Sequence, residues 1–299
     1  MPAGKEQERN SLRALARASA AARRAYRASR RSERATRRAR TLRGLEHALF
    51  GSRMPDAGTQ LARAGWRRDA LDAACPRCGT TRAPFEDVRR GCAECRGRTL
   101  GYDALVRLGR YAPPLSQWVP AIKRRAWRGM ADALGAELGR QVQDAVHAGH
   151  IPQPDVVTFV PTHWLRRLLR GIDHGACLAE AAARVLAVES SPLVAVGLAL
   201  RQTGAGRAAR DAQRGRFSLR RRGAAQCGLE GRDVLLIDDV RTTWATLREV
   251  ARLLRKAGAR SVVAACCAAA DPPNRNSTRF GGQGTAEGGD GAVVPRAVR

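Results

Sequence analysis

Residues 234–246, which read VLLIDDVRTTWAT, constrain the fold of this chain more than any other stretch. They begin with four consecutive apolar residues, a pattern typical of a strand buried on both faces of a parallel sheet. Asp238 and Asp239 follow at the carboxyl end of this strand, and a hydroxyl-rich loop comes next. Apolar residues at helical spacing then continue to Gly258, which is placed to end a helix. The order strand, loop, helix predicts an α/β fold whose ligand site lies at the carboxyl edge of an open sheet.

The residues of this loop favour a sugar phosphate as the ligand. Backbone N–H groups and hydroxyls at a helix N-terminus attract a phosphate, because the helix dipole and the unpaired donors both favour an anion. Carboxylates nearby suit sugar hydroxyls or the water molecules around Mg²⁺. A ligand that carries both a sugar and a phosphate satisfies both sets of groups.

The same stretch resembles the phosphoribosyl pyrophosphate (PRPP) signature of the type I phosphoribosyltransferases, which is an apolar strand, two acids and then Thr-Thr-Gly-Ala-Thr. The departure from this signature is Trp244, which stands where the family has glycine. Glycine allows the backbone to approach the 5′-phosphate closely, or to adopt a φ that other residues dislike. The indole of Trp244 therefore either blocks the phosphate or, if its φ is negative, points out of the loop.

The spacing of four of the eight cysteines predicts a structural metal site. Two Cys-x-x-Cys pairs are separated by 13 residues. Two thiolate pairs on tight turns close a tetrahedral Zn²⁺ site, and a segment with almost no apolar core needs such an ion to hold its fold. Four thiolates leave no open coordination position, so the zinc is predicted to be structural. The ligands are Cys75, Cys78, Cys92 and Cys95.

The rest of the chain supplies further pieces of an α/β fold. Residues 156–160 and 261–270 are apolar runs that predict buried strands, and residues 193–200 are another strand candidate. Residues 102–147 are predicted to be mostly helical, with a break at Pro113-Pro114. The loop after residues 156–160 is rich in arginine and leads into a helix, which is again an arrangement for anions. Its arginines are Arg166, Arg167 and Arg170.

Composition divides the chain into four parts. They are a basic Arg- and Ala-rich tail (1–60), a four-cysteine zinc ribbon (64–100), the α/β domain (101–270) and a Pro-, Gly- and Asn-rich tail that is predicted to be disordered (271–299). The first 53 residues hold 15 Lys or Arg against 4 Asp or Glu, and they are expected to be disordered or partly helical. This segment is either a basic arm for nucleic acid or an anionic membrane, or an extension upstream of a start at Met54.

The net charge of +27 favours nucleic acid as a partner of the basic surfaces. Nearly all of this charge is arginine, which GC-rich coding also produces, so the charge by itself does not define a function. No apolar run approaches the roughly 20 residues that span a bilayer. No charged-then-apolar signal peptide opens the chain, so the expected location is cytoplasmic.

Several motifs in order along the chain resemble the ComF family. They are the four-cysteine module, an aromatic-rich connector with Lys123, residues 160–174, a glycine-bearing loop at 203–217 and the acid pair with its loop. The resemblance covers about residues 64–270 and implies a type I phosphoribosyltransferase-like domain, a double zinc ribbon and a link to DNA uptake in competent bacteria. A departure is the family's Arg-Gly-Phe-Asn-Gln, which is Arg-Gly-Ile-Asp-His at residues 170–174.

The resemblance also implies roles for the site residues. Asp238 and Asp239 are expected to accept the ribose hydroxyls, with Mg²⁺ bridging the oxygens of PRPP. The 5′-phosphate is expected to bind at Thr242, Thr243, Ala245 and Thr246, and the pyrophosphate to face Arg166, Arg167 and Arg170. Transfer of this kind needs no nucleophilic side chain, because placement and charge neutralisation are what the reaction requires.

Two functions of different classes follow from these residues. In the first, the protein is a phosphoribosyltransferase that binds PRPP and Mg²⁺ and acts on an unidentified nitrogen base or amine. In the second, the fold persists as a ligand-sensing or nucleic-acid-handling module in DNA uptake, and Trp244 marks the loss of turnover.

Overall fold

A computed structural model of the chain describes residues 57–83, 86–88, 91–162, 169–196, 216–220 and 228–272. Most of the predicted basic tail lies outside the described residues, as do the glycine-bearing loop from 203 to 215 and residues 273–299. Arg166 and Arg167 also lie outside them. Among the described residues no helix is long and apolar enough to cross a membrane.

A five-stranded sheet forms the centre of the molecule, and every neighbouring pair of its strands is parallel. Its order is β1 (Ala104–Arg110), β7 (Ser261–Ala269), β6 (Asp233–Arg241), β2 (Val156–Phe159) and β3 (Glu189–Ser190). The two central strands β6 and β7 are buried along most of their length, as their unbroken apolar runs predict. The predicted open, mostly parallel α/β sheet is confirmed.

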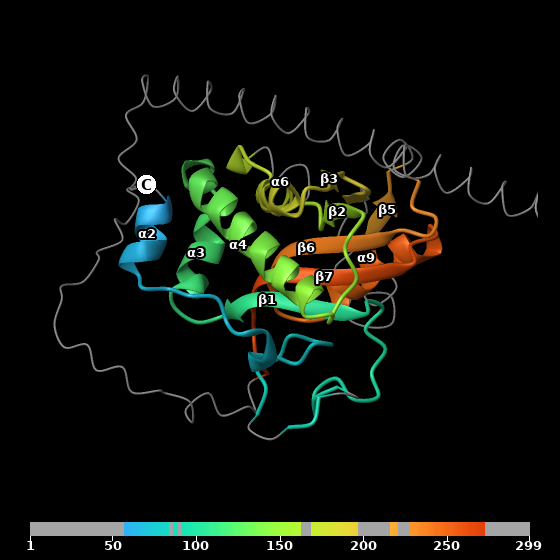
Figure 1. The fold of residues 1–299 in the computed structure, drawn as a ribbon. Coiled ribbons are helices and arrows are strands. Elements are labelled where there is room, and N and C mark those ends of the chain that lie inside the picture. The colour runs from blue at the N-terminus through green and yellow to red at the C-terminus, as the bar shows by residue number, and fades with distance from the viewer. Residues whose placement is uncertain are drawn as a thin grey trace, which may run out of the picture.

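Helices cover the two faces of this sheet, and Figure 1 shows α4 and α6 packed side by side on one of them. That face carries α3 (Leu115–Ala121), α4 (Arg128–His147) and α6 (His174–Leu186), with the short η2 (Arg125–Trp127) before α4. The opposite face is covered by α9 (Ala245–Lys256) together with the four cysteines of the paired motifs. Each face therefore has its own hydrophobic core.

The segment before the cysteines packs on the helical face. Its helix α2 (Ala57–Arg63) contacts α4, and the ring of Trp66 meets that of Trp118 edge to face with centroids 5.7 Å apart. The short η1 (Leu71–Ala73) then leads into the four-cysteine module. Residues just before the module thus belong to the packing of the α/β layer.

One prediction of local structure was wrong. Residues 104–110 form the edge strand β1, whereas the prediction made this region mostly helical. The strand candidate at 193–200 does contain a strand, β4 (Val194–Val196), which within the described residues pairs antiparallel with β5 (Phe217–Leu219) in a separate two-stranded sheet. The main sheet instead gains the short strand β3 beside β2.

The crossovers leave the sheet in opposite directions at β2 and β6. The chain passes from β2 through α6 to β3 on one face, and from β6 through α9 to β7 on the other face. The carboxyl ends of β2 and β6 therefore diverge. This is the topological switch point at which open α/β sheets bind ligands.

Candidate functional site

The acid pair lies at this switch point, beyond the end of the pairing between β6 and β2. The last register partners of these strands are Phe159 and Ile237, and the Val160 N–H donates to the carbonyl of Ile237 at 2.9 Å. β6 continues past this point, because β7 pairs with it as far as Arg241. β6 is thus longer than the four apolar residues indicate, and it contains Asp238 and Asp239. At these two residues β6 is paired with β7 on one edge, while its other edge is no longer paired with β2.

The two carboxylates face opposite sides of the sheet, because successive side chains of a strand alternate. Leu236 belongs to the core under α9, and Asp238 follows it on that side. Ile237 belongs to the core under α3 and α6, and Asp239 follows it there. The Asp239 N–H donates to Oδ1 of Asp238 at 2.9 Å, which fixes the two residues relative to each other.

Asp239 is buried and surrounded by cationic or donor groups. Its Oδ2 lies 2.8 Å from Nζ of Lys123 and 3.5 Å from Nε2 of His174. Its Oδ1 accepts a hydrogen bond from the N–H of Val240 at 2.9 Å. Lys123 comes from the turn between α3 and η2, and His174 is the first residue of α6, so three separate segments meet at this carboxylate.

The environment drives the pKa values of the two acids apart. Burial and the charge of neighbouring Asp239 hold the pKa of Asp238 well above its usual range. Burial acts in the same direction on Asp239, but the His174 hydrogen bond and the Lys123 ammonium outweigh it and lower the pKa of Asp239. Asp239 is therefore the carboxylate that carries the negative charge of the pair most readily.

The loop after β6 opens α9 without a side-chain cap. Thr242 and Thr243 are exposed, and Trp244 occupies the N-cap position with no capping hydrogen bond from its side chain. The first N–H groups of a helix have no partner inside the helix. The exposed hydroxyls and the uncapped first turn, which includes Ala245 and Thr246, therefore provide donors for an anion at the sheet edge.

Trp244 has an ordinary backbone conformation, with φ −83° and ψ −6°. This answers one part of the question that the sequence leaves open, since the backbone here does not need the freedom of glycine. The half-buried indole packs against the core under α9, and the guanidinium carbon of Arg98 lies 5.2 Å from the ring centroid. The ring is thus held by the four-cysteine module, from which Arg98 comes.

Arg170 is half-exposed and precedes α6 in the connection from β2. It is the one member of the predicted pyrophosphate-facing arginines that the described residues include. Its chain position places it on the β2 side of the switch point, while the hydroxyl loop is on the β6 side.

The four cysteines of the paired motifs come together as a metal site. Their side chains are fully buried, and their sulfur atoms all lie within 4.8 Å of one another. The close sulfur pairs are separated by 3.4, 3.7 and 3.9 Å. Zinc–sulfur bonds of about 2.3 Å in a tetrahedron place two sulfur atoms about 3.8 Å apart, so the cluster fits Zn²⁺. The ligands are Cys75, Cys78, Cys92 and Cys95.

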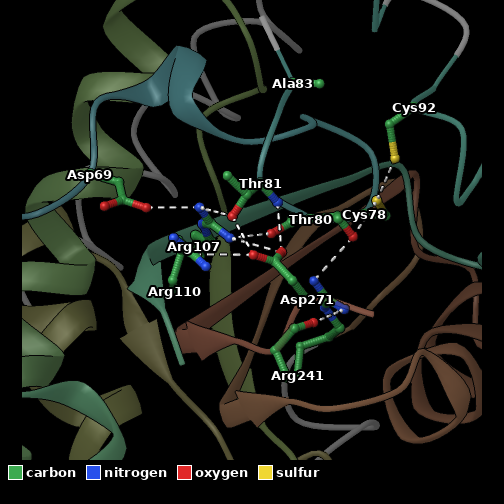
Figure 2. A network of polar contacts seen from close by, with 12 residues as sticks. Asp69, Cys78, Thr80, Thr81, Ala83, Cys92, Arg107, Arg110, Arg241 and Asp271 are labelled. Atoms are coloured by element: carbon green, nitrogen blue, oxygen red, sulfur yellow. Dashed lines mark hydrogen bonds and ion pairs between the residues drawn. The ribbon is translucent and has the colours of Figure 1, made fainter. Parts of the chain in front are cut away.

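A polar network joins this four-cysteine module to the carboxyl edge of the sheet (Figure 2). Arg107 of β1 is buried, and it donates to the carbonyl of Gly79 at 2.8 Å and to Oδ2 of Asp69 at 2.8 Å. Asp271, just after β7, accepts from the N–H and hydroxyl of Thr81 at 2.8 and 2.6 Å. The predicted disordered tail therefore begins inside an ordered network, because its first residue is held on the sheet.

A second link runs from the metal site to the end of β6. Cys78 Sγ lies 3.3 Å from the Thr80 hydroxyl, and that hydroxyl accepts from Nη2 of Arg241 at 3.3 Å. Arg241 also donates to the carbonyl of Ala270 at 2.7 Å. Since Arg241 directly precedes the hydroxyl loop, the four-cysteine module supports the end of β6 from which this loop starts.

The five-stranded parallel sheet, the acid pair at its switch point and the helix that starts after the hydroxyl loop define a phosphoribosyltransferase-like α/β protein that carries a four-cysteine module. No family model matches the chain. Among curated proteins it is similar to competence protein F of Haemophilus influenzae, with 26% identity over 190 residues that cover 62% of this chain and 82% of that protein. It is also similar to the DNA utilization protein YhgH of Escherichia coli K12, with 28% identity over 192 residues that cover 64% of this chain and 82% of that protein. Both relatives carry names that refer to competence or DNA utilization, in agreement with the predicted resemblance to the ComF family.

Solved structures with a similar arrangement include two enzymes. The allosteric regulatory enzyme of purine biosynthesis is 21% identical, with a TM-score of 0.33, and the match covers 47% of this chain and 26% of that one. The glutamine PRPP amidotransferase from B. subtilis gives the same values. Structural likenesses of this size carry no information about activity.

Sequence reasoning missed the partners of Asp239. Lys123 and His174 are far from the acid pair in sequence, and neither has a neighbour at ligand spacing that would mark it. A signal was present in each case: Lys123 is one of three lysines in an arginine-rich chain, and His174 stands in the motif that departs from the family pattern.

Proposed function

We propose that this chain binds a ribose phosphate, with PRPP as the leading candidate, at the carboxyl ends of β2 and β6. The observation that carries the proposal is the acid pair beyond the last β2 partner, followed directly by an uncapped helix start with exposed hydroxyls. Phosphate is favoured at the helix start, and sugar hydroxyls are favoured at the carboxylates.

In this proposal the two ends of the ligand bind to different segments. The 5′-phosphate lies against the loop of Thr242, Thr243 and the first turn of α9, and the ribose lies toward the acid pair. Arg170 approaches from the β2 side, where a pyrophosphate would be placed. Mg²⁺ would be held by the pyrophosphate of PRPP rather than by both acids, because the two carboxylates face opposite sides of the sheet and do not converge on one ion.

Transfer to an acceptor is the reaction that this arrangement supports. The bond between C1 of the ribose and the pyrophosphate oxygen breaks, the pyrophosphate leaves with the bonding electrons, and an acceptor nitrogen forms the new bond to C1 and gives up its proton to solvent. The protein contributes placement and charge at both ends of the ligand. The acceptor is a nitrogen base or an amine in this proposal.

Calorimetric titration of PRPP with Mg²⁺ tests the binding step. We expect Asp239→Asn to weaken binding by about tenfold or more, since a lost charged hydrogen bond costs about 1.5–3 kcal/mol. Asp233→Asn is the matched control: it changes the same residue type at the opposite end of β6, where Asp233 bonds Ser261 and Arg260. Equal affinity of the Asp239→Asn variant and the unmodified protein would refute the proposed site. Release of pyrophosphate in the presence of candidate amines then tests transfer.

A second candidate function is handling of nucleic acid during DNA uptake. The names of the two relatives, which refer to competence and DNA utilization, and the net charge of +27 favour it. Binding to single-stranded DNA should then weaken steeply as salt increases, because phosphate contacts release counterions. The test compares the full chain with a variant that lacks residues 1–53. DNA binding that persists in this variant assigns the contact to the rest of the chain, and binding that disappears assigns it to the basic tail.

A further inference from the structure

Lys123 already occupies the place of a cation at the acid pair. Its ammonium lies 2.8 Å from Oδ2 of Asp239, and that carboxylate is only 10% exposed. Lys123 itself is 30% exposed, so its charge is partly shielded from water. A charge pair of this geometry at reduced exposure is stronger than an exposed surface pair.

Each oxygen atom of Asp239 lies against a donor or a cation of the protein. Oδ1 accepts from the Val240 N–H, and Oδ2 faces Lys123 and His174. A Mg²⁺ ion demands near-octahedral oxygen ligands at about 2.0–2.1 Å, so it would have to displace the ammonium to reach Oδ2. The other carboxylate cannot complete such a site, because Asp238 faces the opposite side of the sheet and accepts from the Asp239 N–H.

The charges around Asp239 also argue against a divalent cation at this carboxylate. Burial raises the pKa of Asp238, while Lys123 and His174 favour the ionised form of Asp239. The ammonium of Lys123 thus supplies one positive charge 2.8 Å from the carboxylate whose ionised form is favoured. A divalent cation added beside Lys123 would place excess positive charge in a partly buried site.

We propose that Lys123 is the built-in counter-ion of Asp239 and takes the place of a divalent cation there, so that a ribose phosphate without pyrophosphate binds at this site independently of Mg²⁺. Lys123 is then a positioning residue, which holds the carboxylate in place for the ribose hydroxyls. The claim that a ribose phosphate binds without Mg²⁺ rests on the proposed function. The claim that Lys123 is the counter-ion of Asp239 does not.

Two measurements test the inference with the full chain, in buffers depleted of Mg²⁺ by resin so that no chelator removes metal from the four-cysteine module. The variants are Lys123→Met and, as the matched control, Lys256→Met, which makes the same change at an exposed position at the end of α9. In the first measurement, about 5 mM Mg²⁺ alone should raise the melting temperature of Lys123→Met by about 2 °C or more, because the freed carboxylate binds the ion in the native state. The unmodified protein and Lys256→Met should shift by less than about 1 °C.

The second measurement is calorimetric titration of ribose 5-phosphate with and without Mg²⁺. The Kd of the unmodified protein should change by less than about twofold, whereas Lys123→Met should bind about tenfold more weakly when Mg²⁺ is absent. A Mg²⁺ requirement in the unmodified protein would overturn the proposal, and so would a Lys123→Met variant that Mg²⁺ does not stabilise. If ribose 5-phosphate binds to none of the proteins, the proposed function fails, and the melting temperatures with Mg²⁺ alone still decide the role of Lys123.

Discussion

Replacing Trp244 by glycine restores the residue of the PRPP signature and tests whether the indole obstructs the loop. We predict that the variant loses stability but binds ribose 5-phosphate within about threefold of the unmodified protein, a difference of about 0.7 kcal/mol. The reason is that φ at this position is −83°, which any residue adopts, and that the ring is held by Arg98 and the core under α9.

The size of the stability loss follows from the contacts of the indole. Truncating a fully buried Trp or Phe costs about 3–5 kcal/mol, so a half-buried ring accounts for about half of that. The contact with the guanidinium of Arg98 adds about 0.5–1 kcal/mol. Glycine is tolerated at an N-cap within a few tenths of a kcal/mol of the best residues. The free energy of unfolding should therefore fall by about 2–3.5 kcal/mol.

Urea unfolding followed by circular dichroism measures this loss, and calorimetric titration measures the affinity. Trp66→Ala is a suitable control, since Trp66 is also half-buried and makes its ring contact with Trp118 on the other face of the sheet. It should lose stability without a change in affinity. A Trp244→Gly variant that binds tenfold more tightly, or that alone binds at all, would show that the indole blocks the phosphate.

Three further predictions concern the module and the acid pair. Arg107→Met should lower the free energy of unfolding by about 3–5 kcal/mol in urea titrations, because it leaves buried partners unpaired, whereas Arg110→Met, whose side chain is 34% exposed, should cost less than about 1 kcal/mol. Equal losses would remove the special role of the buried arginine. Asp238→Asn should flatten the pH dependence of stability. Because the pKa of Asp238 is raised in the native state, the unmodified protein should lose stability as pH rises above the pKa of the unfolded state, about 4, by up to about 1.4 kcal/mol per pH unit. An asparagine has no proton to lose, so the variant should not show this loss. Unfolding curves between pH 4 and 8 that are parallel for both proteins would contradict the assignment. Cys78→Ser should release bound zinc in a colorimetric assay and lower the melting temperature, and retention of one zinc ion per chain would contradict the four-cysteine site.

The sequence predicted the centre of the fold well, because the signals there are local. Residues 234–246 contain the strand, the acids and the helix start in one continuous stretch, and residues 234–237 of β6 and most of β7 are apolar. The four-cysteine site was likewise predictable from the spacing of its pairs.

The failures have a common physical cause, which is pairing between distant residues. Strand β1 was predicted as part of a mostly helical segment, yet it is an edge strand whose Arg107 is buried by partners from the four-cysteine module and by Asp69. Asp271 was assigned to a disordered tail on composition, although Thr81 binds it from nearly two hundred residues away. The partners of Asp239 were missed for the same reason.

The shared core of the cysteines and α9 has a consequence for how the chain reaches its native state. The four thiols are synthesised long before β6, α9 and β7, the elements that pack against them in the second core. Domains generally fold as units, so the core that encloses the thiols closes only after β7 has been synthesised. Zinc starvation of a growing culture should therefore reduce the yield of native protein, whereas a chelator added to the finished protein must wait for the core to open.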